Sequence, residues 1–206
     1  MTDTPRKRAP AMSPQERRAA IVNAALPLVT QHGTNVTTSQ IARAAGIAEG
    51  TVFRVFSDKR ELLLACVDAA VRAEPVVEEI RRIPRDLDLQ TRLVRTAEAL
   101  DGHMRGMGAL MHALGATGFR LERGPELERY KERRQWNDDV LRAVVEVIEP
   151  DQDALRLSAE RAARILLSLV FGERMGCGSF GGTVAGSDEL IDFFLRGALR
   201  AEPGGH

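Results

Sequence analysis

Hydroxyl and basic side chains gather between Thr37 and Lys59, at a spacing that suits contact with a phosphate backbone. Thr37, Thr38 and Ser39 supply three hydroxyl groups, and Arg54 and Lys59 supply positive charge. Hydroxyl groups and free N–H groups at the start of a helix favour an anion, and arginine binds phosphate or guanine in a bidentate way. The chemistry predicted for this segment is recognition of a polyanion.

Two short helices are expected to position these side chains. Thr37 and Gln40 form a capping-box pattern for a helix that ends at Ala45-Gly46, and a second helix covers Glu49 to Val55. Their predicted apolar interior consists of Ile41, Ala42, Ala45, Ile47, Val52, Phe53 and Phe56. Two helices joined by a tight glycine-containing turn form a helix-turn-helix, whose second helix can enter the major groove of DNA.

A helix is predicted on each side of this pair. The first starts at a capping box, Ser13-Pro14-Gln15-Glu16, and ends at Gly33. Pro27 lies within its apolar pattern and predicts a bend, because proline removes a backbone hydrogen bond. The helix that follows the pair is capped by Ser57 and Asp58 and runs to about Val71, with Pro75 within or just beyond its end.

Residues 13–63 resemble the DNA-binding domain of the TetR/AcrR family of bacterial transcription regulators. The resemblance rests on an ordered set of residues at the family's spacing: Gly33, Thr37-Thr38-Ser39, Ile41-Ala42, Ala45-Gly46-Ile47, Gly50-Thr51-Val52-Phe53, Phe56, Lys59 and Leu62. It implies a homodimeric, ligand-responsive regulator, most often a repressor, that binds a double-stranded DNA operator. It also implies an all-α fold with an N-terminal three-helix helix-turn-helix domain and a C-terminal helical bundle for ligand binding and dimerisation.

The predicted DNA-contacting residues combine this resemblance with the residue chemistry. They are Thr37, Thr38, Ser39, Glu49, Gly50, Thr51, Phe53, Arg54 and Lys59. Arg54 suits guanine or a phosphate, Gly50 allows close approach of the backbone, and Lys59 resembles the family's phosphate-contacting lysine.

Three residues of this segment differ from the simplest DNA-binding pattern. The family usually has a phosphate-contacting tyrosine where Phe53 stands, and often a histidine where Val55 stands. Glu49 would repel phosphate unless it accepts a hydrogen bond from a cytosine amino group. DNA affinity is therefore expected to depend more on Arg54, Lys59 and the basic N-terminal arm.

Composition and charge favour an all-α protein with a basic head. Ala, Leu, Arg and Glu dominate, and the net charge is zero. Residues 1–60 nevertheless hold nine Lys or Arg against four Asp or Glu, which leaves the remainder acidic. Residues 1–12 are predicted to be a disordered basic arm, either a solvated tail or a contact to phosphate or a minor groove. Residues 13–60 are predicted to form the DNA-binding domain.

No sequence feature predicts a cofactor, a metal site or membrane insertion. Cys66 and Cys177 lie in apolar stretches without metal-ligand spacing, so buried thiols are expected. No apolar run approaches the roughly 18 residues that span a bilayer, and the N-terminus has no secretory pattern. The protein is expected to be cytoplasmic.

Residues 61–202 are predicted to form the effector-binding and dimerisation domain, with 203–206 as a tail. Glycines scattered from Gly102 to Gly118 predict a short, broken or mobile segment, because each costs about 1 kcal/mol against alanine in a helix. Methionine adapts to irregular cavities, so a ligand pocket is one interpretation and core packing the other. The tentative pocket residues are His103, Met104, Met107, Met111, Phe119 and Trp136.

Two strongly apolar helices near the C-terminus predict a dimer interface. They occupy about 158–176 and 187–199, with a flexible loop expected from Gly176 to Gly186, and a charged helix is predicted near Pro125 to Glu149. In the family, the last two helices pair with their mates as a four-helix interface. The predicted interface residues are Leu166, Val170, Phe171, Ile191, Phe194 and Leu195.

Two other function classes stay open at this point. A helical enzyme is disfavoured, because no ordered set of nucleophile, base and orienting group appears. A DNA-binding or architectural helical protein without a small-molecule effector is the second alternative, since a cavity cannot be read from composition. The sequence leaves the effector and the operator unidentified.

Overall fold

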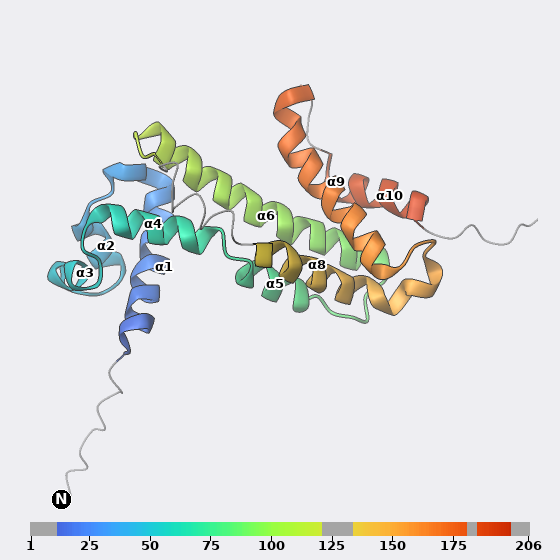
Figure 1. Cartoon of the computed structure of the whole chain (residues 1–206), viewed down its shortest axis with the longest axis horizontal. Helices are drawn as coiled ribbons and strands as arrows, with labels where there is room; N and C mark the ends of the chain where they lie inside the picture. The colour runs from blue at the N-terminus through green and yellow to red at the C-terminus, as the bar shows by residue number, and fades with distance from the viewer. Residues whose placement is uncertain (1–11, 121–133, 181–184, 199–206) are drawn as a thin grey trace, which may run out of the picture. The chain divides into compact units, whose positions relative to one another are not determined.

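The computed structural model describes residues 12–120, 134–180 and 185–198, and within these ranges the chain contains helices and no strand. Figure 1 shows the helices in chain order. The all-α prediction is confirmed. The chain divides into two compact units, Met1–Val71 with Ala109–Arg120, and Arg72–Gly108 with Leu121–His206.

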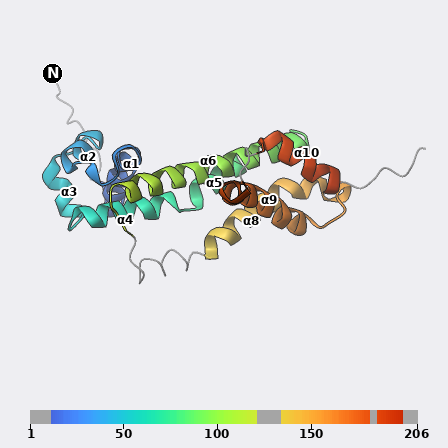
Figure 2. The ribbon, with the colours of Figure 1, turned by 90° about the horizontal axis from the view of Figure 1, so that it is seen from above.

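The first unit contains the predicted helix-turn-helix. Its helices are α1 (Pro14–His32), the 3-10 helix η1 (Gly33–Asn35), α2 (Thr38–Ala44), α3 (Glu49–Val55) and α4 (Lys59–Ala70). Figures 1 and 2 both show α2 and α3 side by side next to α1, and all three pairs are in contact. Their shared core includes Ile21, Val29, Ile41, Val52, Phe56, Leu62 and Cys66.

Local capping fixes where these helices begin. Ser13 and Glu16 form a reciprocal capping box, and Thr37 and Gln40 form a second one. Asp58 caps α4 by accepting a hydrogen bond from the backbone N–H of Glu61. All three caps agree with the sequence prediction. Such caps typically stabilise a helix by about 1 kcal/mol.

The glycine-rich segment is a continuous helix, so its prediction as short or broken was wrong. α6 spans Leu89–Ala116 in 28 residues. The side chains of Leu100, Leu110 and Leu114 are almost fully buried along it. Burial of one leucine contributes about 1.5–3 kcal/mol, which outweighs the roughly 1 kcal/mol that each glycine costs.

The end of α6 belongs to the core of the first unit. Leu110 and Leu114 are members of that core, and Met111 and Phe119 pack against it. The compact unit therefore extends past the predicted boundary at residue 60, because it includes α4 and residues 109–120.

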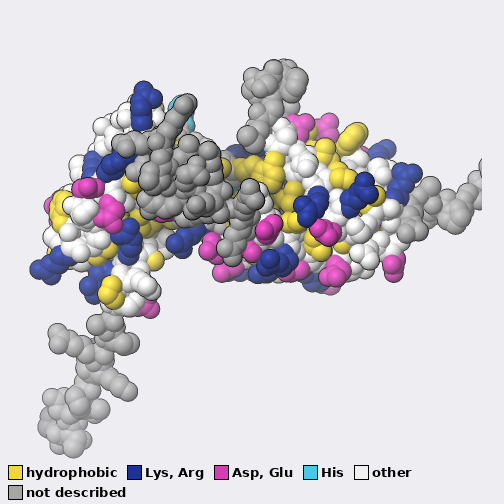
Figure 3. All heavy atoms as spheres, viewed as in Figure 1, with side chains coloured by type: hydrophobic (Ala, Val, Ile, Leu, Met, Phe, Trp, Pro, Cys, Tyr) yellow, Lys and Arg dark blue, Asp and Glu magenta, His cyan; other side chains and the backbone are white. Residues whose placement is uncertain are grey.

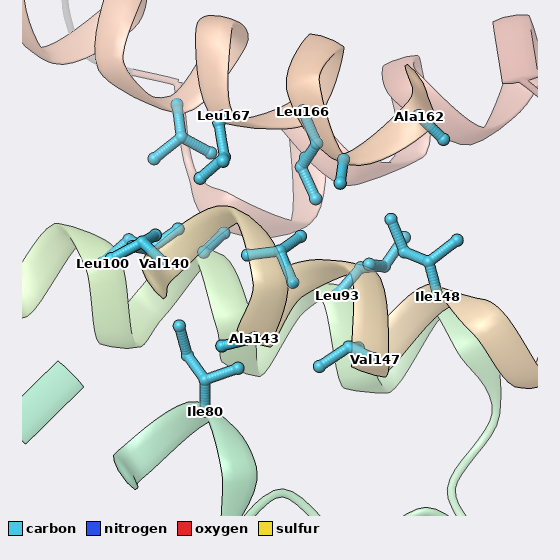
Figure 4. Close-up of a cluster of buried hydrophobic side chains, with 14 of the residues drawn as sticks. Ile80, Leu93, Leu100, Val140, Ala143, Val147, Ile148, Ala162, Leu166 and Leu167 are labelled. Atoms are coloured by element: carbon cyan, nitrogen blue, oxygen red, sulfur yellow. The ribbon is translucent and has the colours of Figure 1, made fainter. Parts of the chain in front are cut away.

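The second unit contains α5 (Glu74–Arg81), the earlier part of α6, α8 (Arg134–Ile148), η2 (Glu149–Ala154), α9 (Ala159–Phe180) and α10 (Ser187–Ala198). Figure 4 shows its centre, where α5, α6, α8 and α9 all contribute side chains. The labelled residues there are Ile80, Leu93, Leu100, Val140, Ala143, Val147, Ile148, Ala162, Leu166 and Leu167.

Three sequence expectations change in this unit. α5 was not predicted, and Pro75, which was expected within or just beyond the end of the preceding helix, stands in the first turn of α5. α9 continues to Phe180, so the loop expected from Gly176 begins too early. The predicted charged helix corresponds to α8, which is described from Arg134 onward. Residues 125–133 of that predicted helix lie outside the described residues. Residues 1–11 of the predicted arm and the predicted tail also lie outside them.

Candidate nucleic-acid interface

The turn between α2 and α3 is closed by backbone hydrogen bonds around Gly46. The N–H of Gly46 donates to the carbonyl of Arg43 at 3.2 Å, and the N–H of Ile47 donates to the carbonyl of Ala42 at 3.0 Å. Gly46 has a φ of +66°, a left-handed conformation that glycine adopts without strain. The turn therefore fixes the angle at which α3 leaves α2.

One face of α3 is open to solvent. Glu49, Gly50, Phe53 and Arg54 are exposed, whereas Val52 is buried. Phe53 was predicted to join the apolar interior, but it is 54% exposed. The reason is helical geometry: Phe53 follows Val52 by 100°, so both cannot face the core. Four candidate DNA-contacting residues thus share an accessible surface.

Glu49 is tied to α2 by a hydrogen bond. The hydroxyl of Thr38 donates to Oε1 of Glu49 at 2.5 Å, across 11 residues of sequence. A threonine hydroxyl has one proton to donate, so in this arrangement Thr38 cannot also donate to a phosphate.

Thr37 and Ser39 occupy the start of α2. The Thr37 hydroxyl accepts from the N–H of Gln40 at 3.1 Å, and the Gln40 side chain accepts from the N–H of Thr37 at 2.8 Å. Thr37 therefore serves as a helix cap, while Ser39 is exposed. Thr51, half-buried on α3, lines a neighbouring groove.

Lys59 has a structural partner. Its Nζ donates to the carbonyl of Thr34 at 2.6 Å, and the side chain is half-buried. This contact ties the start of α4 to η1. The sequence could not show it, because the two residues lie 25 positions apart.

Arg17 and Arg18 add basic groups that the sequence prediction did not select. An open groove of about 790 Å³ runs between α1 and α3, and it is lined by Pro14, Gln15, Arg17, Arg18, Ile47, Ala48, Thr51, Arg54 and Val55. Three arginines thus border one groove. The charge pattern of the first predicted helix was the signal that could have identified them.

Arg18 also holds three elements together. Its Nη1 donates to the carbonyl of Val55 at 3.3 Å and to Oε1 of Glu61 at 2.8 Å. Its guanidinium lies 4.3 Å from the centre of the Phe56 ring, within cation–π range. α1 is thereby fixed to the end of α3 and the first turn of α4.

Comparison with known proteins supports a DNA-binding helix-turn-helix in this part of the chain. The family described as "Bacterial regulatory proteins, tetR family" matches residues 21–66, which include α2, α3 and their turn. This segment is therefore similar to a domain of the TetR family. This match, together with the match of nearly the whole chain to a transcriptional regulator, supports a DNA-binding transcriptional regulator rather than an enzyme.

Several transcriptional regulators are similar to this chain over nearly its whole length. The HTH-type transcriptional regulator BetI of Agrobacterium fabrum is 29% identical, over 92% of this chain and 91% of its own length. A putative TetR-family regulator from Mesorhizobium loti has a TM-score of 0.60 at 16% identity, covering 92% of this chain and 100% of that one. A putative regulator from Saccharomonospora viridis, in complex with choline, has a TM-score of 0.57 at 20% identity, covering 91% and 100%.

The predicted ligand residues divide between the two units. Met104 and Trp136 pack against the core of the second unit. Met107 is half-buried and belongs to the same unit. Met111 and Phe119 instead pack against the core of the first unit.

His103, Trp136 and Phe171 form an aromatic cluster in the second unit. The rings of His103 and Trp136 are stacked with centroids 6.1 Å apart, and those of Trp136 and Phe171 are 5.6 Å apart. Nε2 of His103 is buried and has no hydrogen-bond partner among the described residues. Burial lowers the pKa of His103, although the charge of Glu79 opposes the shift.

The predicted interface residues lie inside the protomer. Leu166, Val170, Ile191, Phe194 and Leu195 are buried members of the second unit's own core, and Phe171 packs against it. The large hydrophobic side chains that protrude from α9 and α10 are Ile165, 41% exposed, and Phe193, 71% exposed. The side chains of residues 175–180 lie outside this description.

The described residues show neither a metal cluster nor a membrane span. No group of three His, Cys, Asp or Glu side chains within them is placed to hold a metal ion. Of the helices in those ranges, none has the length and hydropathy of a bilayer span. Cys66 is buried, and burial raises the pKa of its thiol to about 12, so it is a poor metal ligand and nucleophile.

Proposed function

We propose that this regulator is a homodimeric cytoplasmic repressor that a small hydrophobic molecule releases from its operator. The observation that carries DNA recognition is the exposed face of α3, with Glu49, Gly50, Phe53 and Arg54 beside one another. An exposed helix held by a rigid turn can enter a major groove. Arg54 supplies the positive group best suited to a guanine edge or a phosphate.

Phosphate contacts are proposed on both sides of this helix. Thr37 and Ser39 stand at the start of α2, and Lys59 stands at the start of α4. Arg17 borders the groove beside α3 and adds a cation that DNA could neutralise. Figure 3 shows Lys and Arg side chains on several sides of the α2 and α3 pair. Such contacts position the protein without reading sequence.

Dimerisation is supported by the exposed apolar side chains of α9 and α10. Phe193 and Ile165 protrude into solvent, and Leu169 and Leu190 are only partly buried. On the face in Figure 3, hydrophobic side chains gather over α9. Packing against a second copy of the chain would remove these side chains from water. Two linked DNA-binding domains would also bind two half-sites of the operator with avidity.

The aromatic cluster of the second unit supports an effector site. A buried polar atom without a partner costs about 1–3 kcal/mol, so a ligand that bonds to Nε2 of His103 would recover that energy. The lowered pKa keeps this imidazole neutral near pH 7, so one nitrogen donates and the other accepts. Met104, Trp136 and Phe171 supply apolar surroundings for a hydrophobic molecule.

A thermal-shift screen of small hydrophobic molecules tests the effector proposal. Choline, the ligand of the Saccharomonospora viridis protein, is one defined probe. A ligand of the folded state raises the melting temperature, and the response should be lost in Trp136→Ala but kept in His112→Ala, which alters an exposed histidine. The same molecule should weaken operator binding. A ligand that stabilises the protein without changing its affinity for DNA would contradict the proposal that the effector releases the protein from its operator.

A further inference from the structure

We propose that Glu49, positioned by Thr38, reads a cytosine in the major groove of the operator. The proposal rests on the proposed placement of α3 in that groove. Glu49 is exposed at the first position of α3, and the hydroxyl of Thr38 donates to its Oε1 at 2.5 Å. An exposed glutamate otherwise samples many rotamers, and this hydrogen bond restricts it to one orientation relative to α2.

The carboxylate can accept further hydrogen bonds while Thr38 holds it. An ionised carboxylate has about four lone-pair sites and no proton to donate. Phosphate oxygens are acceptors too, so Glu49 gains nothing from the DNA backbone. Its partner on a duplex must be a hydrogen-bond donor.

Major-groove chemistry selects cytosine among the four bases. Guanine offers only acceptors on that edge, and thymine offers one acceptor and a methyl group. Adenine has a donor at N6, but N7 beside it is an acceptor that repels a carboxylate. Cytosine offers the N4 amino donor without a neighbouring acceptor on its own ring.

Neighbouring residues leave room for this contact. Gly50 follows Glu49, and a Cβ built at Gly50 meets no atom within 4 Å. Phe53 lies one turn further along the same face and is exposed. A base edge can therefore approach the carboxylate without a side chain from position 50 in its way.

Thr38 becomes a positioning residue in this account. It holds Glu49 and does not itself touch the base. Removal of the Thr38 hydroxyl should reduce the preference for cytosine at one base pair and leave the preferences at the other base pairs unchanged. A hydroxyl that contacts phosphate would instead alter affinity for all duplexes alike.

Selection from a library of random duplexes tests the proposal with the full-length protein. Wild type should enrich a site with a fixed C·G pair in each half-site. Glu49→Gln should weaken binding to that duplex about tenfold and shift the preference there towards adenine, which glutamine binds in a bidentate way. Thr38→Val should reduce discrimination at the same pair alone, and Thr38→Ser, which keeps the hydroxyl, should restore it.

The outcomes separate this proposal from the proposed function. If wild type enriches no sequence, the operator-binding function fails together with the proposal. If wild type enriches a site but Glu49→Gln enriches the same base at every position, only the cytosine reading is overturned. Equal loss of affinity for all duplexes in folded Thr38→Val shows a phosphate contact and overturns the positioning role.

Discussion

Thr34 and Thr117 form a reciprocal pair across 83 residues of sequence. The hydroxyl of Thr117 accepts a hydrogen bond from the N–H of Thr34 at 2.8 Å, and the hydroxyl of Thr34 donates to the carbonyl of Thr117 at 2.9 Å. The carbonyl of the same Thr34 accepts from Lys59. The chain just after α6 and the first residue of α4 therefore meet at η1, within one compact unit.

Gly33 makes this junction possible, and replacing it should destabilise the fold. A Cβ at Gly33 would lie 2.3 Å from the carbonyl oxygen of Ala113 and 2.3 Å from the hydroxyl oxygen of Thr117, and φ is +56°. We expect Gly33→Ala to lower the free energy of unfolding by about 2–5 kcal/mol, the sum of left-handed strain and overpacking. Chemical denaturation measures the change.

Gly46→Ala is the matched control for this prediction. Gly46 has a similar φ of +66°, but a Cβ there meets nothing within 4 Å. Only the strain of about 1–2 kcal/mol applies. Equal destabilisation by the two substitutions would show that the close approach to residues 113 and 117 is unimportant.

Phe53→Tyr should strengthen operator binding. Phe53 is 54% exposed on α3, and the added hydroxyl would restore the phosphate contact that the family resemblance implies for this position. A net hydrogen bond is worth about 1 kcal/mol, or roughly fivefold in affinity. The hydroxyl is uncharged, so the salt dependence of binding should stay the same.

Phe53→Leu serves as the control, because it changes the same exposed side chain without adding a hydroxyl. Fluorescence anisotropy with a labelled operator compares the two variants with wild type. Unchanged or weaker binding by Phe53→Tyr would mean that no phosphate lies within reach of position 53.

Phe193→Glu should convert the dimer into a folded monomer. The side chain is 71% exposed, so a charge there leaves the protomer core intact but would be buried without a partner in a dimer. Sedimentation at micromolar concentration should show monomers, with unchanged helical circular dichroism. Gln90→Glu adds the same charge at another exposed position of the second unit and should remain dimeric. A dimeric Phe193→Glu variant would exclude α10 from the interface.

Glu61 should contribute to the acid sensitivity of the first unit. Hydrogen bonds from the N–H of Ser57, from Arg18 and from the Ser57 hydroxyl lower the pKa of Glu61. A folded pKa below the unfolded one gives stability above about pH 4.3, which is lost as the pH falls towards the folded value. Glu61→Gln should thus be less stable than wild type at pH 7 and lose less on acidification. Parallel pH curves for the two proteins would contradict this linkage.

Local signals were sufficient to predict the helices α1 to α4 of the first unit, but not the part of α6 that packs into it. Helix caps depend on residues three positions apart, so Ser13, Thr37 and Asp58 could be assigned from sequence, and the turn at Gly46 follows from its neighbours. The hydrogen bond between Thr38 and Glu49 and the bond between Lys59 and Thr34 depend on how helices pack, which spacing does not reveal.

The second unit was harder to predict for two physical reasons. The glycines of α6 disfavour a helix locally, and the burial of Leu100, Leu110 and Leu114, which decides the outcome, involves distant segments. Apolar periodicity in α9 and α10 shows that a face is buried but not what covers it. Leu166 and Phe194 are covered by their own protomer, while Phe193 protrudes.

The central claim is that the exposed face of α3 recognises DNA. The affinity of the Arg54→Ala variant for the operator tests this claim most directly. Arg95→Ala is the control, because it removes the same charge from an exposed position of the second unit. On the duplex that wild type selects, we predict that Arg54→Ala weakens binding by at least about 1 kcal/mol while Arg95→Ala binds as wild type does. Wild-type affinity in a correctly folded Arg54→Ala protein would contradict the account.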